Sequence, residues 1–588
     1  MIIGCNYWAS NAGVRMWRDW DETAVRDDLK ILSEHGVNTM RVFPTWDDFQ
    51  PVTEYWGAMG FFEEYRMADG SLPSNADFLD ETMLERFEKF CDICDEYNIR
   101  LIVGLITGWM SGRLFVPSAL IRKNLYTDPT ALLFEQRFIR GFVTRFKHRE
   151  TVYAWDLGNE CNCMSSAETR ETAASWTALI SNAIKANDST RPVVSGMHSL
   201  TVDGVWTMHD QGEFTDILTT HPYPVFVPHC RRDKIMSMRT LMHATCETQY
   251  YADISGRPCL VEEIGTLGPM VASDEAAADF LRVNLFSNWA NGAPGVLWWC
   301  ANEQSNLNEP PYAWTMCERE LGMINAKHEP KPVLREMKKF AEFLKNSEIK
   351  LSPAKCGGVC ITTKGQDNWG ISYMSYILAK QAGTGIEFAA YDGEIPEADI
   401  YLLPSVSETC SLSKEKYYNL LGRVKDGATL YISMDNAFLT DFEEVTGLKI
   451  TDSRASHCEG NMGTVKFRRD STLYLVSTGA EVLAEENGNP LFTVHKYGKG
   501  KVYYLNFPLE KMLLGEDDAF DGDYYKIYCK IFGTESNPAL GITENGDYKV
   551  VINYTDTEQQ CPVFDGFSPV YGGNTVKPYD CCILKRSI

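Results

Sequence analysis

Residues 155–160 read Trp155-Asp156-Leu157-Gly158-Asn159-Glu160, an apolar run that ends in a carboxylate. A second run of the same kind lies much later in the chain and reads Pro258-Cys259-Leu260-Val261-Glu262-Glu263-Ile264-Gly265. Near-continuous apolar runs of this length predict strands that are buried on both faces of a parallel sheet. Both runs therefore predict a strand that delivers an acidic side chain at its carboxyl end.

Strand-like and helix-like segments alternate on either side of these runs, up to about residue 348. The predicted strands are 2–7, 39–43, 100–105, 152–157, 192–196, 217–221, 259–263 and 295–299. The predicted helices between them are 22–35, 81–97, 131–146, 167–186, 232–252 and 276–290. This alternation predicts a (β/α)8 TIM barrel over residues 1–348, with an active site at the carboxyl ends of the strands.

Two further regions follow the predicted barrel. In residues 349–515, strands at 358–363, 385–389, 399–403 and 429–433 with helices between them predict a small flavodoxin-like α/β domain. Residues 535–588 alternate apolar and polar side chains between Gly546-Asp547 and Gly572-Gly573 turns, which predicts a C-terminal antiparallel β domain. The α/β region contains no nucleophile elbow or phosphate loop, so we expect a structural or assembly role for it, while the sequence assigns no role to the C-terminal β domain.

Two carboxylates on separate strand ends are what hydrolysis of a glycosidic bond requires. Asn159-Glu160 resembles the acid/base motif of the clan A retaining glycoside hydrolases, and Glu263-Ile264-Gly265 resembles that clan's nucleophile motif, closest to glycoside hydrolase family 5. The resemblance implies that Glu160 is the acid/base and Glu263 the nucleophile. As a general acid, Glu160 would need a raised pKa.

Glu262 and Asp156 are the competing carboxylates. Neighbours on a strand point to opposite faces, so we expect only one of Glu262 and Glu263 to face the barrel mouth. The family pattern selects Glu263, and Glu262 would pack towards the outer helices or pair with a base. Asp156 lies inside its strand and could belong to a salt bridge within the barrel.

The resemblance also implies roles for polar residues at other strand ends. Arg41, inside a predicted strand, would support the nucleophile, the alternative being a structural salt bridge. Asn159 would bond the sugar 2-hydroxyl, although an Asn before a helix can also be a cap. Tyr223 of His221-Pro222-Tyr223 would bond the nucleophile, and His221 would face the sugar.

Aromatic side chains at the strand ends are candidates for stacking on the sugar. Trp299, from Trp298-Trp299 at the end of the eighth predicted strand, resembles the clan's sugar platform. Trp109 and Trp46, after the third and second strands, are further candidates, and Asn6 at the end of the first strand completes the predicted binding residues. The long polar loop after Trp299 has a length that is usually functional.

Composition narrows the class of partner. The net charge of −24 disfavours nucleic acid and anionic membranes and favours neutral ligands such as an oligosaccharide or glycoside. The 18 cysteines are scattered, and the Cys161-x-Cys163 and Cys581-Cys582 pairs have no partner with zinc spacing, so we expect no metal and no cofactor. The first residues read as a strand without a basic segment before it, so no signal peptide is predicted, and the cytoplasm is the expected compartment.

These observations together predict a retaining, exo-acting β-glycosidase, with β-mannosidase as the leading activity. The alternatives are a β-galactosidase or β-glucosidase of the same clan, an endo-acting β-mannanase, and an inactive carbohydrate-binding protein. The 349–515 region resembles the trimerisation domain of the family 42 β-galactosidases, which implies a homotrimer.

Overall fold

The computed structural model describes residues 1–587. The chain divides into two compact units. The first comprises Met1–Tyr223, Ser255–Trp289 and Ala293–Ile349, and the second comprises Pro224–Ile254, Ala290–Gly292 and Lys350–Ile588. Within the described residues, no helix combines the length and the apolar character that crossing a bilayer requires.

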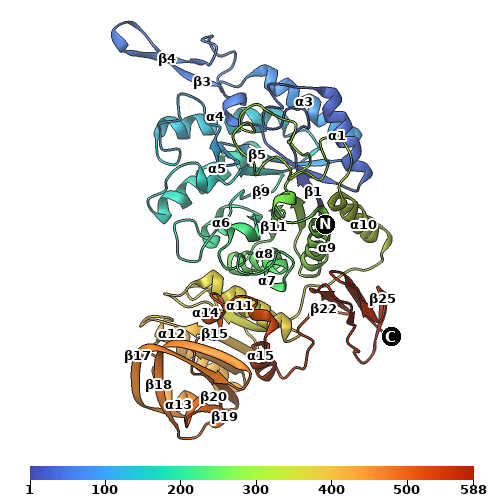
Figure 1. Ribbon diagram of the computed structural model, residues 1–588. Coiled ribbons are helices and arrows are strands. Elements are labelled where there is room, and N and C mark those ends of the chain that lie inside the picture. Colours follow the sequence, from blue (N-terminus) through green and yellow to red (C-terminus); the bar gives the residue numbers. More distant parts are fainter. Residues whose placement is uncertain (588) are drawn as a thin grey trace. The chain divides into compact units, whose positions relative to one another are not determined.

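The first unit is an eight-stranded parallel barrel (Figure 1). Its strands are β1 (Ile2–Asn6), β2 (Thr39–Val42), β5 (Arg100–Ile106), β8 (Val152–Gly158), β9 (Val193–Val194), β10 (Leu218–Thr220), β11 (Cys259–Ile264) and β12 (Gly295–Trp298). They pair in the order β10-β11-β12-β1-β2-β5-β8-β9. A parallel bridge between Val194 and Ile217 joins the two ends of this order. The predicted (β/α)8 barrel is therefore confirmed.

Helices follow most of the barrel strands, and acidic side chains cap several of them. The helices are α1 (Glu22–Glu34), α3 (Glu81–Glu96), α4 (Pro129–Phe146), α5 (Arg170–Asn187), α6 (Met208–Phe214), α9 (Asp274–Ala290) and α10 (Pro332–Asn346). Asp21, Asp80 and Asp128 accept hydrogen bonds from backbone N–H groups in the first turns of α1, α3 and α4. These bonds satisfy donors that a helix start leaves without a partner.

The loops at the carboxyl ends of the strands carry small elements of their own. After β2 come the short helix α2 (Trp46–Phe49) and an antiparallel hairpin of β3 (Val52–Trp56) and β4 (Phe62–Met67), which extends away from the barrel (Figure 1). After β5 comes a smaller hairpin of β6 (Trp109–Met110) and β7 (Arg113–Leu114). A short 3-10 turn, η2 (Cys161–Cys163), follows β8.

The second unit contains a seven-stranded sheet in the order β14-β13-β15-β16-β21-β20-β19. The strands are β13 (Cys356–Ile361), β14 (Gly385–Ala389), β15 (Ile400–Val406), β16 (Thr429–Met434), β19 (Glu481–Glu486), β20 (Asn489–Tyr497) and β21 (Gly500–Leu505). The first five in the sheet order are parallel, and β20 and β19 add to them antiparallel. The helices α11 (Asn368–Gln381) and α12 (Lys414–Asp426) lie where helices were predicted.

Three more parts complete the second unit. The predicted helix at 232–252 is divided into α7 (Met238–Leu241) and α8 (His243–Ser255). A long two-stranded hairpin, β17 (Leu448–Met462) and β18 (Val465–Ser477), was not predicted. Near the end of the chain, β22 (Leu540–Asn545), β23 (Tyr548–Asn553), β25 (Phe567–Tyr571) and β27 (Cys581–Arg586) form the expected antiparallel sheet.

Candidate active site

Arg41 on β2 lies at the centre of a buried group of acids. Its Nε donates to Asp156 Oδ2 at 2.8 Å and lies 3.2 Å from Glu262 Oε1. Its Nη1 donates to Glu263 Oε1 at 3.0 Å, and its Nη2 donates to the carbonyl oxygen of Gly158 at 2.9 Å. A buried guanidinium is tolerated only with such partners. One side chain thereby fixes acidic residues of both β8 and β11.

Glu263 is held by both of its carboxylate oxygens. Oε1 accepts the bond from Arg41, and Oε2 accepts a bond of 2.9 Å from the hydroxyl of Tyr223. The carboxylate is nearly inaccessible, with 6% of the side chain exposed. Burial raises the pKa of Glu263 above its ordinary value, and the nearby Glu160 adds to the rise. The structure therefore places Glu263 in a rigid and polar setting.

Glu160 stands at the end of β8 in a left-handed backbone conformation, with φ 44° and ψ 48°. Such a conformation is uncommon outside glycine and often marks a functional position. Its Oε2 accepts a 3.1 Å bond from Trp109 Nε1, and its Oε1 lies 2.9 Å from His221 Nδ1. About a fifth of the side chain stays open, because the exposed fraction is 21%.

His221 lies within hydrogen-bonding distance of several of the acids. Besides Glu160, its Nδ1 lies 3.5 Å from Glu263 Oε2, and its Nε2 lies 3.2 Å from Glu262 Oε2. Burial would lower the pKa of His221, but Glu263 and the other carboxylates raise it to about 10. Both ring nitrogens therefore face carboxylates, which differs from the expectation that His221 faces the sugar.

The expectation that Glu160 has a raised pKa is wrong for this arrangement. Burial would raise its pKa, but the hydrogen bond with His221 and the nearby His198 lower it to about 2. The contact between the two side chains therefore favours the ionised carboxylate of Glu160 and the protonated imidazole of His221.

Glu262 and Glu263 both point into the barrel, contrary to the expectation from strand alternation. The pairing of β11 with β12 explains this, because it passes from Val261–Val296 to Ile264–Trp298 and skips the two glutamates. The irregularity is a bulge, which redirects side chains in this way. Glu262 is fully buried between Arg41 and His221. It pairs with bases as one alternative predicted, and it does not pack towards the outer helices.

The carboxylates of Glu160 and Glu263 face each other across a short gap. Single ligand atoms of Glu160, His221 and Glu263 all lie within 4.8 Å of one another. Carboxyl groups lie roughly 5–5.5 Å apart in retaining glycosidases and roughly 6.5–9.5 Å apart in inverting ones. The nearest carboxylate oxygens of Glu160 and Glu263 are therefore close enough to flank one anomeric carbon.

Two aromatic residues border the site. Trp109, half-buried, donates to Glu160 as described, and Trp299 is 6% exposed. Trp299 Nε1 donates to Glu318 Oε2 at 3.3 Å. Burial raises the pKa of Glu318 to about 7, with further contributions from Glu263 and Glu160. Sequence reasoning did not single out Glu318, although it lies in the long polar loop that was marked as functional.

The loops after β5 and β12 touch each other at the barrel mouth. Arg113 Nη2 donates to Thr315 Oγ1 at 3.0 Å, and its guanidinium lies over the Trp314 ring at 4.9 Å from the centroid. In the strand order, β1 and β2 separate β12 from β5. The two loops therefore come from strands that are not neighbours in the barrel. We call this contact the loop bridge.

Three of the predicted binding residues are enclosed by protein. Trp46 is fully buried and donates to Gln50 Oε1 at 2.8 Å, so it offers no surface to a sugar in this structure. Asn6 is also fully buried and donates to the Glu262 carbonyl oxygen at 2.9 Å. Asn159, which is 2% exposed, accepts a bond from Arg41 Nη1 at 3.0 Å and donates to the Trp109 carbonyl oxygen at 3.1 Å.

Known proteins resemble this chain in sequence and in fold. Mannan endo-1,4-beta-mannosidase A of Podospora anserina is 24% identical over 239 residues, which are 35% of this chain and 60% of that protein. The chain thus spans less than two thirds of this relative's length.

Among solved structures, the exo-beta-1,4-mannosidase of Opitutaceae bacterium strain TAV5 is 23% identical with a TM-score of 0.74, covering 90% of this chain and 96% of that one. A beta-galactosidase from the Antarctic haloarchaeon Halorubrum lacusprofundi is 12% identical with a TM-score of 0.71, and the match covers 100% of this chain and 99% of that one. At these identities, both show a shared fold.

The sequence model described as Cellulase (glycosyl hydrolase family 5) matches residues 7–305. That range is about half of the 588 residues and includes β8, β11 and β12 with Asp156, Glu160, Glu262 and Glu263. The chain is a glycoside hydrolase and belongs to glycosyl hydrolase family 5.

Proposed function

We propose that this protein is a retaining exo-acting β-mannosidase in which Glu263 is the nucleophile and Glu160 the acid/base. The observation that carries the proposal is the gap of at most 4.8 Å between carboxylate oxygens of the two residues. That gap suits direct attack on the anomeric carbon better than it suits an intervening water. Arg41 and Tyr223 would orient Glu263 through their bonds to its two oxygens.

The reaction takes two displacements. A Glu263 oxygen bonds to the anomeric carbon while the glycosidic bond breaks and Glu160 gives its proton to the leaving oxygen. Glu160 then takes a proton from water, whose oxygen attacks the anomeric carbon and releases Glu263. Glu160 must be protonated for the first step, and the imidazole of His221 is 2.9 Å away. We propose that His221 supplies this proton when the sugar enters between the carboxylates, and that it takes the proton back from Glu160 when the product leaves.

The loop bridge supports exo action. It joins the loops after β5 and β12, and such a contact at the mouth would hinder a long chain from lying through the site. Trp299 and Trp109 would contact the sugar within the remaining space. Asn159 would bond the 2-hydroxyl only after exchanging its bond to Arg41 or Trp109, because both ends of its amide are engaged.

The preference for mannoside rests on the names of similar proteins. The sequence relative is a mannan endo-1,4-beta-mannosidase, and one structural neighbour is an exo-beta-1,4-mannosidase. An endo-acting mannanase is the second candidate, because the named activity of the sequence relative favours it. A β-galactosidase is the third, since the fold likeness to beta-galactosidases extends over the whole chain.

One assay separates these candidates. Purified protein is offered p-nitrophenyl β-mannoside, β-galactoside and β-glucoside, mannooligosaccharides of increasing length, and polymeric mannan. We expect the β-mannoside to be cleaved fastest and mannose to be the first product from every oligosaccharide. Internal cleavage of mannan, seen as an early fall in viscosity, would replace the exo assignment with the endo one. Faster cleavage of the β-galactoside would replace the β-mannosidase assignment with a β-galactosidase one.

We also propose a homotrimer in the cytoplasm. The trimer is supported by the resemblance of residues 349–515 to the trimerisation domain of the family 42 β-galactosidases, and the seven-stranded mixed sheet of residues 356–505 is consistent with it. The 18 free thiols fit a reducing compartment. Cell fractionation with an antibody against the protein tests the compartment.

A further inference from the structure

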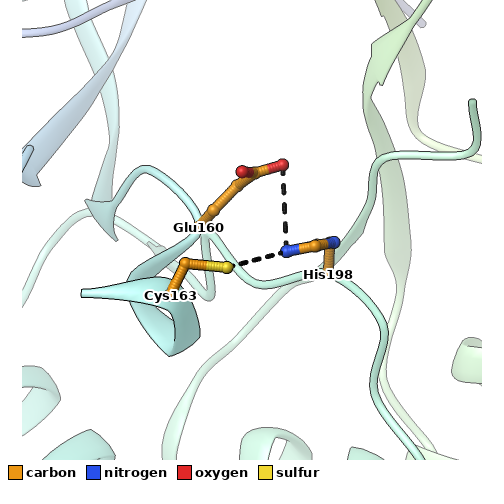
Figure 2. A group of neighbouring side chains, drawn as sticks. All are labelled: Glu160, Cys163 and His198. Carbon is orange, nitrogen blue, oxygen red and sulfur yellow. Dashed lines mark hydrogen bonds and ion pairs between the residues drawn. The ribbon is translucent and has the colours of Figure 1, made fainter. Parts of the chain in front are cut away.

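Three side chains with ligand atoms for a soft metal ion meet beside the candidate acid/base (Figure 2). Cys163 Sγ and His198 Nε2 are 3.3 Å apart, and His198 Nε2 lies 3.9 Å from Glu160 Oε1. Ligand atoms of all three lie within 4.8 Å of one another. A tetrahedral zinc ion holds sulfur, nitrogen and oxygen ligands at about 2.0–2.3 Å, which places those ligands roughly 3.4–3.6 Å from each other. The spacing between Cys163 and His198 is close to these values, and the other two would need to shorten slightly on binding an ion.

The backbone brings these groups together in a defined way. The 3-10 turn η2 folds Cys163 back over Glu160, with the Cys163 N–H donating to the Glu160 carbonyl oxygen at 2.8 Å. Asn162 Nδ2 donates to the His198 carbonyl oxygen at 2.8 Å and so ties the loop after β9 to this turn. Hydrogen bonds therefore hold the backbones of the three residues close to one another.

The imidazole of His198 is oriented for coordination. Its Nδ1 lies 3.0 Å from Ser199 Oγ, and its ring stacks on that of His221 with centroids 5.7 Å apart. A partner on the second nitrogen is the usual arrangement for a metal-binding histidine, because it fixes the tautomer and the ring plane. With Nδ1 held by Ser199, Nε2 can present its lone pair towards Cys163 and Glu160.

We propose that Glu160, Cys163 and His198 form a binding site for a borderline-soft divalent cation such as Zn²⁺, and that the bound ion inhibits the enzyme. A set of one thiolate, one imidazole and one carboxylate suits Zn²⁺ and does not suit Mg²⁺ or Ca²⁺, which prefer oxygen. Binding converts the Cys163 thiol to a thiolate and releases its proton to water. The inhibition rests on the proposed role of Glu160, because a carboxylate bound to the ion cannot exchange a proton with the substrate.

Binding is tested first, without reference to activity. The full-length reduced protein is titrated with Zn²⁺ by calorimetry, and with Co²⁺ by absorption spectroscopy. We expect one tight site and a thiolate-to-cobalt charge-transfer band. Cys163→Ser and His198→Gln should each weaken Zn²⁺ binding by about tenfold or more, and Cys163→Ser should remove the band. Cys410→Ser changes an exposed free thiol elsewhere and should leave both signals as in the wild type.

Inhibition is tested on each variant against its own rate without metal. Zn²⁺ should inhibit the wild type and Cys410→Ser equally, with reversal by a chelator, and should need at least about tenfold more metal to inhibit Cys163→Ser. Equal Zn²⁺ binding by the wild type, Cys163→Ser and His198→Gln would overturn the proposal and place the ion on Glu160, His221 and Glu263 instead. Absence of the band in the wild type would overturn it even if Cys163→Ser failed to fold.

The two proposals fail separately. A wild type that binds Co²⁺ through a thiolate but cleaves no glycoside would keep the metal site and remove the proposed function. An active wild type without the charge-transfer band would keep the function and remove the metal site.

Discussion

At the scale of single residues, the two adjacent glutamates at the bulge in β11 have different neighbours, and we expect different roles for them. Glu263 lies within 4.8 Å of Glu160, whereas Glu262 is locked between Arg41 and His221. Replacing Glu263 by alanine should lower kcat by about 10⁴-fold or more, because the covalent step is lost. Azide should restore turnover and give a product of inverted configuration, which NMR of the released sugar detects.

The matched change at the neighbouring position is Glu262→Ala. It removes a buried partner of two cations and should cost about 3–5 kcal/mol of folding stability, read as a lower melting temperature. Azide should not rescue it. Rescue of Glu262→Ala, with none of Glu263→Ala, would exchange the two roles.

Glu318 gives a prediction about pH. Burial raises its pKa to about 7, above the value near 4.3 of an unfolded chain, so the folded state binds its proton more tightly. Stability is therefore lost as the pH rises from about 4.3 to about 7 and the buried group ionises. Glu318→Gln should match the wild type at pH 5 and melt about 2–4 °C higher at pH 8.

The control for Glu318 is Glu309→Gln, an exposed glutamate in the same loop. Its melting temperature should follow that of the wild type at both pH values. A Glu318→Gln variant that gained nothing at pH 8 would show that Glu318 keeps its charge through neutral pH without cost.

Sequence reasoning reached those site residues that sit directly on strand ends. Glu160, Glu263, Arg41, His221 and Tyr223 were expected near one another, and the structure brings them together. Their catalytic roles remain proposals. The inward turn of Glu262 could not be predicted, because a bulge depends on the pairing with β12. The contact between Cys163 and His198 could not be predicted either, because the two residues come from separate loops.

At the scale of elements, the loop bridge is expected to set the length of substrate. Arg113→Ala removes a hydrogen bond to Thr315 and a cation–π contact with Trp314, which together contribute about 1–2 kcal/mol. The loops should then separate more easily. We expect kcat/KM for p-nitrophenyl β-mannoside to fall by up to about tenfold and the relative rate on polymeric mannan to rise.

Arg122→Ala is the control for the bridge, because Arg122 is exposed in the loop that carries Arg113. It should leave the ratio of polymer to glycoside cleavage unchanged. If Arg113→Ala also left this ratio unchanged, the bridge would not be what limits access.

The barrel strands were predictable because each is a short apolar run between turn signals. Their ends were less so, since β9 has only Val193–Val194 where residues 192–196 were predicted. The hairpin of β17 and β18 escaped prediction for a physical reason. Much of β17 is exposed, and its sequence mixes small and charged residues, so it lacks the apolar alternation that marks a half-buried strand. Its partner strand, not its composition, keeps it extended.

At the scale of the whole molecule, charge and assembly act against each other. Each chain carries a net charge of −24, so a homotrimer brings three strongly acidic bodies together. Salt screens this repulsion, with a Debye length of about 8 Å at 0.15 M ionic strength and about 30 Å at 0.01 M. We expect light scattering to give a trimer mass at the higher ionic strength and a lower mean mass at the lower one. A monomer mass at both ionic strengths would contradict the proposed homotrimer.

Arg41 also has a consequence for how activity returns after denaturation. Its partners Asp156 and Glu263 lie 115 and 222 positions away along the chain, so its hydrogen bonds can form only when most of the barrel has assembled. Contacts this distant in sequence are slow to form. On dilution from urea, the helical circular dichroism should recover before glycosidase activity does, and an intermediate with native-like helices should be catalytically silent. Activity during refolding would thus measure how many molecules have a fully assembled barrel, because turnover requires β2, β8 and β11 to be in contact.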